Sequence, residues 1–194
     1  MDGLYSSMID VCVSLNTKDP VEIFRILVGM DGIPVNGKEH HVIVPLALVT
    51  AFWNASPDFD LRSYLTETVE RASEVPQTIC GYWGCCGSAV GTGIFYSVIT
   101  KTNPLTRGKR WGLCNRMTSE SLLDISEVGG PRCCKRNAVL SIRKAREFVI
   151  RELGIEMDIS DFQCKTHGGN DVCIGYNCPF YIRSEGSMRY IRDP

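Results

Sequence analysis

Two doubled cysteines are the residues of this sequence best suited to chemistry. One is Cys85-Cys86, which closely follows Cys80, and the other is Cys133-Cys134. Three further cysteines lie near the end of the chain, at Cys164, Cys173 and Cys178. Adjacent cysteines are poor disulfide partners for each other, whereas thiolates bind soft metals and attack electrophiles. The pattern therefore indicates metal ligation or thiol chemistry.

The cellular compartment of the protein decides which of these uses of cysteine is favoured. The start, Met1-Asp2-Gly3-Leu4, lacks a signal peptide, and no apolar run approaches the ~20 residues of a membrane span. We therefore expect a cytoplasmic protein without a membrane partner, where disulfides are rare. Ten cysteines would also allow a disulfide framework, which is the alternative. The net charge of −1 gives no reason to expect a nucleic-acid partner.

Cys80, Cys85 and Cys86 lie just before a predicted helix over residues 87–100. Backbone N–H groups and the positive end of the helix dipole would then lie beside the sulfurs. This arrangement should lower the thiol pKa values and favour a metal or an anion. The glycine-rich start of the helix, residues 87–93, resembles a phosphate-binding loop, but no strand precedes it. We favour a small-residue face that packs closely against another helix.

Cys133-Cys134 repeats this arrangement, because Pro131 suits the first turn of a helix. The pair also has three cations around it. These are predicted to bind an anionic substrate or to stabilise thiolates, and they are Arg132, Lys135 and Arg136.

The C-terminal cysteines have two interpretations. With His167, they give four zinc ligands in the order Cys164, His167, Cys173 and Cys178, at a nonstandard spacing. Without it they give three thiolates, and Cys178-Pro179 is similar to the Cys-Pro ending of ferredoxin-type sites. Cys114 fits a core position, a lone nucleophile or an extra ligand, and His40-His41 fits a structural role better than a metal site.

The elements that must position these residues are mostly helices. Asp19 caps a helix that starts at Pro20, and Pro45 starts an apolar helix after a short predicted strand over residues 41–44. Further helices are predicted from Asp58 and over residues 117–128 and 138–153, the last ending at Gly154. We predict a mainly α fold with a helical region (1–76) and a cysteine-rich helical region (77–194). The latter ends in a small irregular metal-binding segment, with room for one short strand or hairpin.

The motifs at residues 80–95 and 129–136 resemble an uncharacterised cysteine-rich family of methanogenic archaea and anaerobic bacteria. The resemblance runs from about Gln77 to Tyr181. It implies an anaerobic, cytosolic setting suited to iron–sulfur chemistry, and it carries over no activity. Cys85-Cys86-Gly87 also matches the Cys-Cys-Gly tripeptide of heterodisulfide reductase-type proteins, although Cys133-Cys134 has no following glycine.

We therefore expect an iron–sulfur protein of anaerobic metabolism that transfers sulfur or electrons. A cubane 4Fe–4S cluster needs four thiolates, so the eight candidate ligands leave room for two sites. Those ligands are Cys80, Cys85, Cys86, Cys133, Cys134, Cys164, Cys173 and Cys178. The expected partner is a small anionic substrate or a redox or assembly protein. The alternatives are a zinc-stabilised binding module without turnover and a metal-free thiol redox enzyme.

Overall fold

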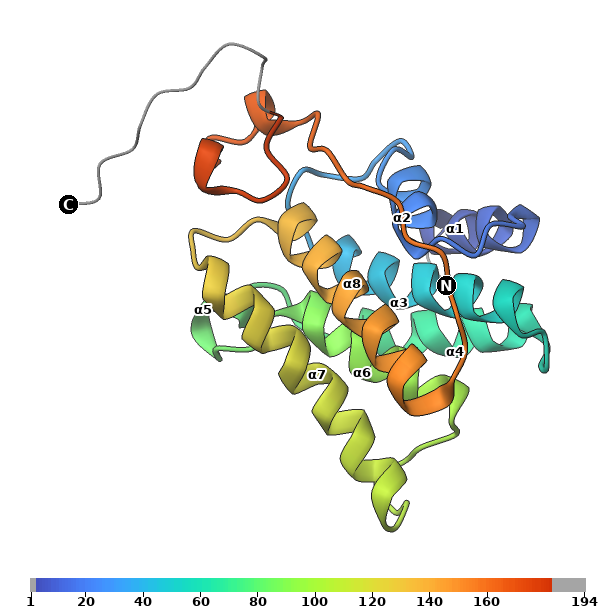
Figure 1. The fold of residues 1–194 in the computed structure, drawn as a ribbon. Helices are drawn as coiled ribbons and strands as arrows, with labels where there is room; N and C mark the ends of the chain where they lie inside the picture. Colours follow the sequence, from blue (N-terminus) through green and yellow to red (C-terminus); the bar gives the residue numbers. More distant parts are fainter. Residues whose placement is uncertain (1–2, 183–194) are drawn as a thin grey trace.

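The computed structural model describes residues 3–182, and they form a bundle of helices with an irregular C-terminal segment (Figure 1). The α-helices are α1 (Gly3–Ser14), α2 (Pro20–Leu27), α3 (Glu39–Ala55), α4 (Leu61–Ser73), α5 (Ile79–Tyr82), α6 (Gly87–Ile99), α7 (Lys109–Val128) and α8 (Cys134–Leu153). Two short 3₁₀ turns follow, η1 (His167–Gly169) and η2 (Gly175–Asn177). The predicted mainly α fold is confirmed.

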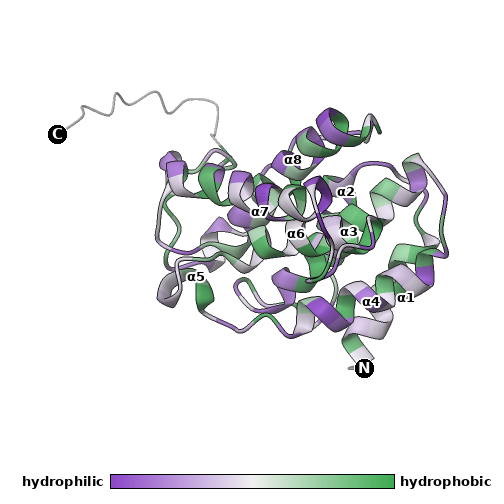
Figure 2. Ribbon diagram, turned by 90° about the horizontal axis from the view of Figure 1, so that it is seen from below, coloured by the Kyte–Doolittle hydropathy of each residue, from purple (hydrophilic) through white to green (hydrophobic). Residues whose placement is uncertain are grey.

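Helix α3 lies at the centre of the bundle, and residues 40–52 of it are all buried. A helix that is apolar on every side must be surrounded, and α3 packs against α2, α4, α6 and α8 (Figure 2). The predicted strand over residues 41–44 is wrong, because the apolar run continues as one helix from Glu39. Pro45 lies inside that helix and has no N–H to offer the carbonyl of His41.

Helix α6 packs closely against α3 and α7 through its glycines. A Cβ added at Gly91 would lie 2.9 Å from Cδ of Pro45 and 3.2 Å from the carbonyl oxygen of His41. One added at Gly87 would overlap the His41 ring, and one at Gly93 would overlap the hydroxyl of Thr118. The interpretation of this stretch as a close-packing face is confirmed, and it fixes the start of α6 against α3.

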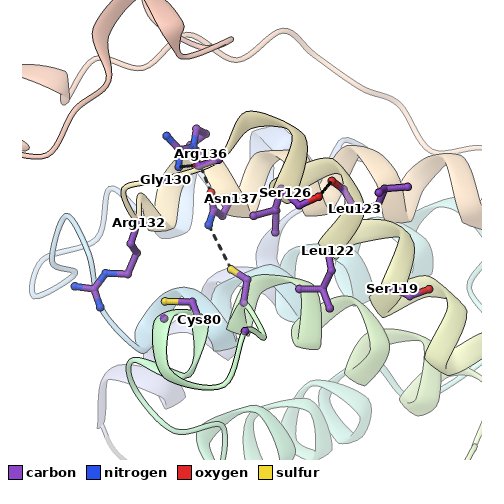
Figure 3. A pocket seen from close by; sticks show the side chains of 14 residues that line it. Cys80, Ser119, Leu122, Leu123, Ser126, Gly130, Arg132, Arg136 and Asn137 are labelled. Atoms are coloured by element: carbon purple, nitrogen blue, oxygen red, sulfur yellow. Dashed lines mark hydrogen bonds between the residues drawn. The ribbon is translucent and has the colours of Figure 1, made fainter.

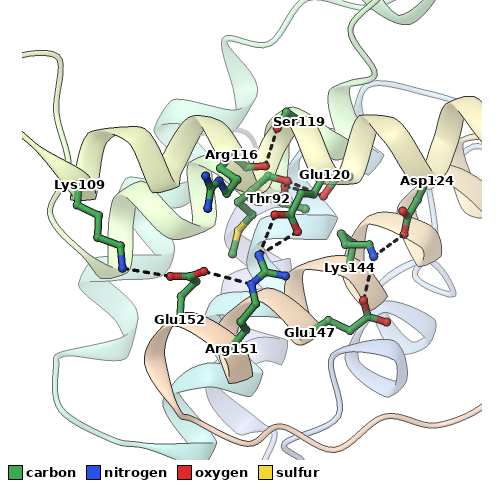
Figure 4. Close-up of polar contacts among 12 residues, drawn as sticks. Thr92, Lys109, Arg116, Ser119, Glu120, Asp124, Lys144, Glu147, Arg151 and Glu152 are labelled. Carbon is green, nitrogen blue, oxygen red and sulfur yellow. Dashed lines mark hydrogen bonds and ion pairs between the residues drawn. The ribbon is translucent and has the colours of Figure 1, made fainter.

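Helices α7 and α8 both begin earlier than the apolar pattern predicted. Helix α8 starts at Cys134 rather than residue 138, and it ends as predicted at Gly154, whose φ of 68° suits a left-handed cap. Away from its start, α8 is joined to α7 by partly exposed ion pairs (Figure 4). Arg151 contacts Glu120 at 2.8 Å, and Lys144 contacts Asp124 at 3.3 Å. Such pairs contribute little each, so burial of the α8 apolar face dominates.

The C-terminal segment runs back along α8 and α2 and crosses the start of α8 (Figure 1). Arg146 donates to the carbonyl of Met157 at 2.8 Å, and Arg25 donates to that of Asp161 at 3.0 Å. The segment forms no strand within the described residues. Its β contact is an isolated bridge between Cys164 and Tyr181, in place of the short strand or hairpin for which the sequence left room. Among residues 3–182, no helix combines the length and apolar character that crossing a bilayer requires.

Candidate metal centre

Both doubled cysteines stand at helix starts, as predicted. Cys86 is the N-cap of α6 and Cys133 is the N-cap of α8, each with extended backbone angles and no side-chain capping bond. Pro131 differs from expectation, because it lies in the loop before α8 rather than in the first turn. Cys85 therefore lies one residue before the N-cap of α6. Cys134, in contrast, follows the N-cap of α8 and is its first helical residue.

At the start of α8, Cys133 and Cys134 line different cavities. Cys134 lines a small cavity together with Cys80, Cys86 and His41. Cys133 instead lines an enclosed cavity of about 20 Å³ with the three C-terminal cysteines, Cys164, Cys173 and Cys178. We call Cys80, Cys85, Cys86 and Cys134 the first thiol group, and Cys133, Cys164, Cys173 and Cys178 the second thiol group.

In the first thiol group, amide side chains contact one cysteine at its sulfur and another at its backbone N–H. The Nδ2 of Asn137 lies 3.5 Å from the Sγ of Cys86, so the first turn of α8 contacts the start of α6 (Figure 3). The N–H of Cys134 donates to Oδ1 of Asn36 at 2.9 Å. N–H contacts to sulfur of this kind orient thiolate ligands and tune the group they bind.

The pKa values of this group differ from the expectation. Burial raises the pKa of the Cys134 thiol to about 11, and burial, followed by the neighbouring Cys86, raises that of Cys85. The predicted lowering by helix N-termini is wrong for these two thiols, because desolvation of the thiolate outweighs the helix dipole. Both are protonated at neutral pH unless a metal displaces the proton.

The short helix α5 supplies Cys80 to the first thiol group. Thr78, which precedes it, has a φ of 72°, a left-handed conformation that a β-branched residue adopts at a cost of about 1–3 kcal/mol. Tyr82, the last residue of α5, and Trp83, which caps it, are 84% and 70% exposed. The turn therefore places two large aromatic side chains in solvent beside a candidate ligand.

A cavity of about 610 Å³ lies next to the first thiol group (Figure 3). The α5 turn, one face of α7 and the loop before α8 form its walls. Its lining residues are Cys80, Gly81, Gly84, Cys86, Ser119, Leu122, Leu123, Ile125, Ser126, Gly129, Gly130, Arg132, Arg136 and Asn137. The cavity thus combines two thiols, hydroxyl and amide groups, and two guanidinium groups on an apolar floor.

The three predicted substrate-binding cations have different environments. Arg136 is 3% exposed, and its guanidinium donates to the carbonyls of Gly129 and Pro131 at 2.7 and 2.8 Å. It therefore holds the loop before α8. Arg132 is exposed at the mouth of the cavity. Lys135 turns to the C-terminal segment, where its Nζ donates to Oγ1 of Thr166 at 3.2 Å.

The second thiol group has its own N–H donors. The Nδ2 of Asn170 lies 3.8 Å from the Sγ of Cys133, and the N–H of Gly175 donates to the Sγ of Cys173 at 3.4 Å. Burial raises the pKa of Cys178, and the nearby Cys133 and Cys164 raise it further. His167 also lines this cavity, with its ring 4.7 Å from that of Tyr181.

The cysteines surround cavities rather than a single point. Among residues 3–182, no three His, Cys, Asp or Glu side chains converge closely enough to hold one ion, and all ten cysteines are free. Cys12 is buried in the core, and the Sγ of Cys114 donates to the carbonyl of Gly93 at 3.3 Å, apart from both groups. A bound metal would have to draw the surrounding thiols inward.

Sequence reasoning missed three residues that contact the two groups, Asn36, Asn137 and Asn170. None has a ligand spacing with the cysteine that it contacts. His41, for which the sequence favoured a structural role, lines the cavity of the first thiol group. Nδ1 of His41 contacts the carbonyl of Val75 at 3.3 Å, which fixes its ring at the start of α6.

Comparison with known proteins places this arrangement in a family. No curated protein and no solved structure matches the chain. A family model described as a family of unknown function, DUF5714, matches residues 8–181, which includes both thiol groups. The chain therefore belongs to the DUF5714 family.

Proposed function

We propose that this protein binds an iron–sulfur cluster at the first thiol group and transfers electrons or sulfur to a small anionic substrate. One observation carries the proposal. Cys80 and Cys86 lie far in sequence from Cys134, yet the three line one small cavity, and two of them also line the cavity of about 610 Å³. Thiolates are the ligands of iron–sulfur clusters, so the donor set fits the group.

The number of ligands supports a cluster that remains accessible. Cys80, Cys86 and Cys134 supply three thiolates, and Cys85 is the adjacent candidate for a fourth. When bound, a cluster would supply one-electron chemistry or labile sulfur next to the large cavity. The N–H of Asn137 at the Sγ of Cys86 would tune its potential.

The other wall of the cavity supports an anionic substrate. Arg132 is exposed at the cavity mouth, while Arg136 reaches the same cavity with its guanidinium already bonded to backbone carbonyls. We therefore assign Arg132 to the first contact with an anion and Arg136 to holding the loop that carries it. Exposed Tyr82 and Trp83 are a candidate contact for a redox partner protein.

The surroundings of the thiols favour metal chemistry over the alternatives. A metal-free thiol redox enzyme needs a thiolate near neutral pH, whereas burial raises the pKa values of Cys85 and Cys134. The motifs that suggest methanogenic archaea and anaerobic bacteria support a cytoplasmic, oxygen-poor setting for the cluster. A zinc-stabilised module without turnover is left as the competing outcome of the test.

The test is anaerobic reconstitution with iron and sulfide, followed by iron and sulfide analysis and absorption and electron paramagnetic resonance spectra. We expect a brown protein with charge-transfer absorption, and we expect Cys86→Ser and Cys134→Ser to lose most of it. Cys114→Ser is the matched control, because Cys114 lies apart from both groups. A colourless wild-type protein, or a spectrum that both variants retain, would overturn the proposal.

A further inference from the structure

Cys133 leaves its sequence neighbour and joins the C-terminal cysteines. The sequence suggests that Cys133 and Cys134 act as a pair, but they line different cavities. Cys133 shares its cavity with Cys164, Cys173 and Cys178, which lie at least thirty residues further along the chain. The fold therefore assembles four thiols that no local motif groups together.

The cavity has room for a single metal ion. Its volume of about 20 Å³ exceeds the ~10–15 Å³ needed for one water-sized particle. Four cysteines in a closed site without an open position are the ligand set of structural zinc.

The charges around the cavity also suit a tetrathiolate zinc site. Four thiolates and one Zn²⁺ carry a net charge of −2. Lys135 and Arg136 both line the cavity and can offset that charge. The N–H groups of Asn170 and Gly175 lie against the sulfurs of Cys133 and Cys173. Such contacts stabilise a thiolate more than a thiol.

The C-terminal segment has little apolar burial of its own to hold its shape. No residue from Gln163 to Pro179 is buried, and the helical elements of this stretch are the two short turns η1 and η2. The flanking Phe162 and Phe180 are buried against the rest of the protein. A loop without a core cannot offset its conformational entropy by apolar burial, and a metal cross-link supplies the missing constraint.

We propose that Cys133, Cys164, Cys173 and Cys178 form a closed structural zinc site that fastens the C-terminal segment to the start of α8. The site is independent of the cluster at the first thiol group. Its ligand set is four cysteines, and His167, whose ring lies against Tyr181, is a neighbour rather than a ligand.

The adjacent cysteines provide the decisive pair of variants. Protein produced with zinc, and separately metal-free protein titrated with Co²⁺ alone, should bind one equivalent at the second thiol group, with sulfur-to-cobalt charge-transfer absorption. We expect Cys133→Ser to reduce Zn²⁺ and Co²⁺ affinity at least tenfold and to retain reconstituted iron. Cys134→Ser should retain Zn²⁺ and Co²⁺ affinity and lose reconstituted iron. His167→Ala should retain both zinc and iron.

The outcomes separate this site from the cluster. The proposal is overturned if Cys133→Ser still binds zinc or if Cys134→Ser loses zinc. It is also overturned if the second thiol group binds iron in place of zinc. Failure of the wild-type protein to bind iron, with zinc behaving as expected, overturns only the proposed cluster. If Cys133→Ser does not fold, Cys173→Ser replaces it, because Cys173 lies in a segment without buried residues.

Discussion

The contact between α3 and α6 predicts opposite effects for the same substitution at two glycines. Gly91 faces α3, where a Cβ would lie 2.9 Å from the Pro45 ring and 3.2 Å from the carbonyl of His41. Gly112 lies inside α7 with its Cβ direction open, since no heavy atom lies within 4 Å. Alanine should therefore destabilise the protein at position 91 and stabilise it at position 112.

The magnitudes decide the sign at each position. Replacing glycine by alanine inside a helix is worth about 0.5–1 kcal/mol. At Gly91 that gain meets an overpacking cost of about 1–3 kcal/mol, because both neighbours belong to buried parts of α3 and cannot move away freely. The net expectation is a loss of about 1–2 kcal/mol for Gly91→Ala, against a gain of up to about 1 kcal/mol for Gly112→Ala.

Urea unfolding followed by circular dichroism measures both free energies, provided the slope with urea is unchanged. The test should use one metal-loading state for all variants, because bound metal adds its own stabilisation. A Gly91→Ala variant as stable as wild type would refute the close packing of α6 on α3. Equal destabilisation at Gly112 would show that loss of glycine itself, and not the contact, is responsible.

Three further predictions concern the surroundings of the thiols. Arg136→Met should cost about 2–3 kcal/mol in urea unfolding, since two carbonyls lose a charged donor, while Arg132→Ala should change stability by less than about 0.5 kcal/mol. Burial, followed by the charge of Lys135, lowers the pKa of His40 from 6.5 to about 4. The unfolded chain then binds the extra proton, so stability should fall by about 1.5 kcal/mol from pH 6.5 to 5, and His40→Leu should remove that slope. Asn137→Ala should cost about 1 kcal/mol and lower the reduction potential of the reconstituted cluster, measured by redox titration; an unchanged potential would mean that its N–H does not act on Cys86.

The sequence predicted those features that depend on neighbouring residues. Asp19 accepts the N–H groups of Val21 and Glu22, and Gly154 ends α8 in a left-handed conformation, because caps are set by a few adjacent residues. Residues 41–44 were assigned to a strand because proline is read as a helix boundary. The surrounding helices instead bury this stretch on all sides, and tertiary packing outweighs the lost hydrogen bond at Pro45.

The candidate site was predictable as a set of residues and not as an arrangement. The cysteines could be identified from their density, and their position at helix starts from glycine and proline nearby. Their division could not, because it depends on how the C-terminal segment returns over α8. The pKa expectation failed for the same reason, since burial of Cys134 is a property of the packed protein.

A doubled cysteine at a helix start can serve two sites at once. The N-cap residue is extended and the next residue is helical, so the two side chains leave the backbone in different directions, although their Cα atoms are only about 3.8 Å apart. In this protein, Asn36 connects the two environments, because its side chain accepts from the N–H of Cys134 and donates to Asn170 at 3.4 Å. A metal bound by Cys133 would therefore also fix the position of Cys134. Loss of zinc leaves every ligand of the cluster site in place, and Asn36 still holds Cys134 through its backbone N–H, so Cys133→Ser should still take up iron.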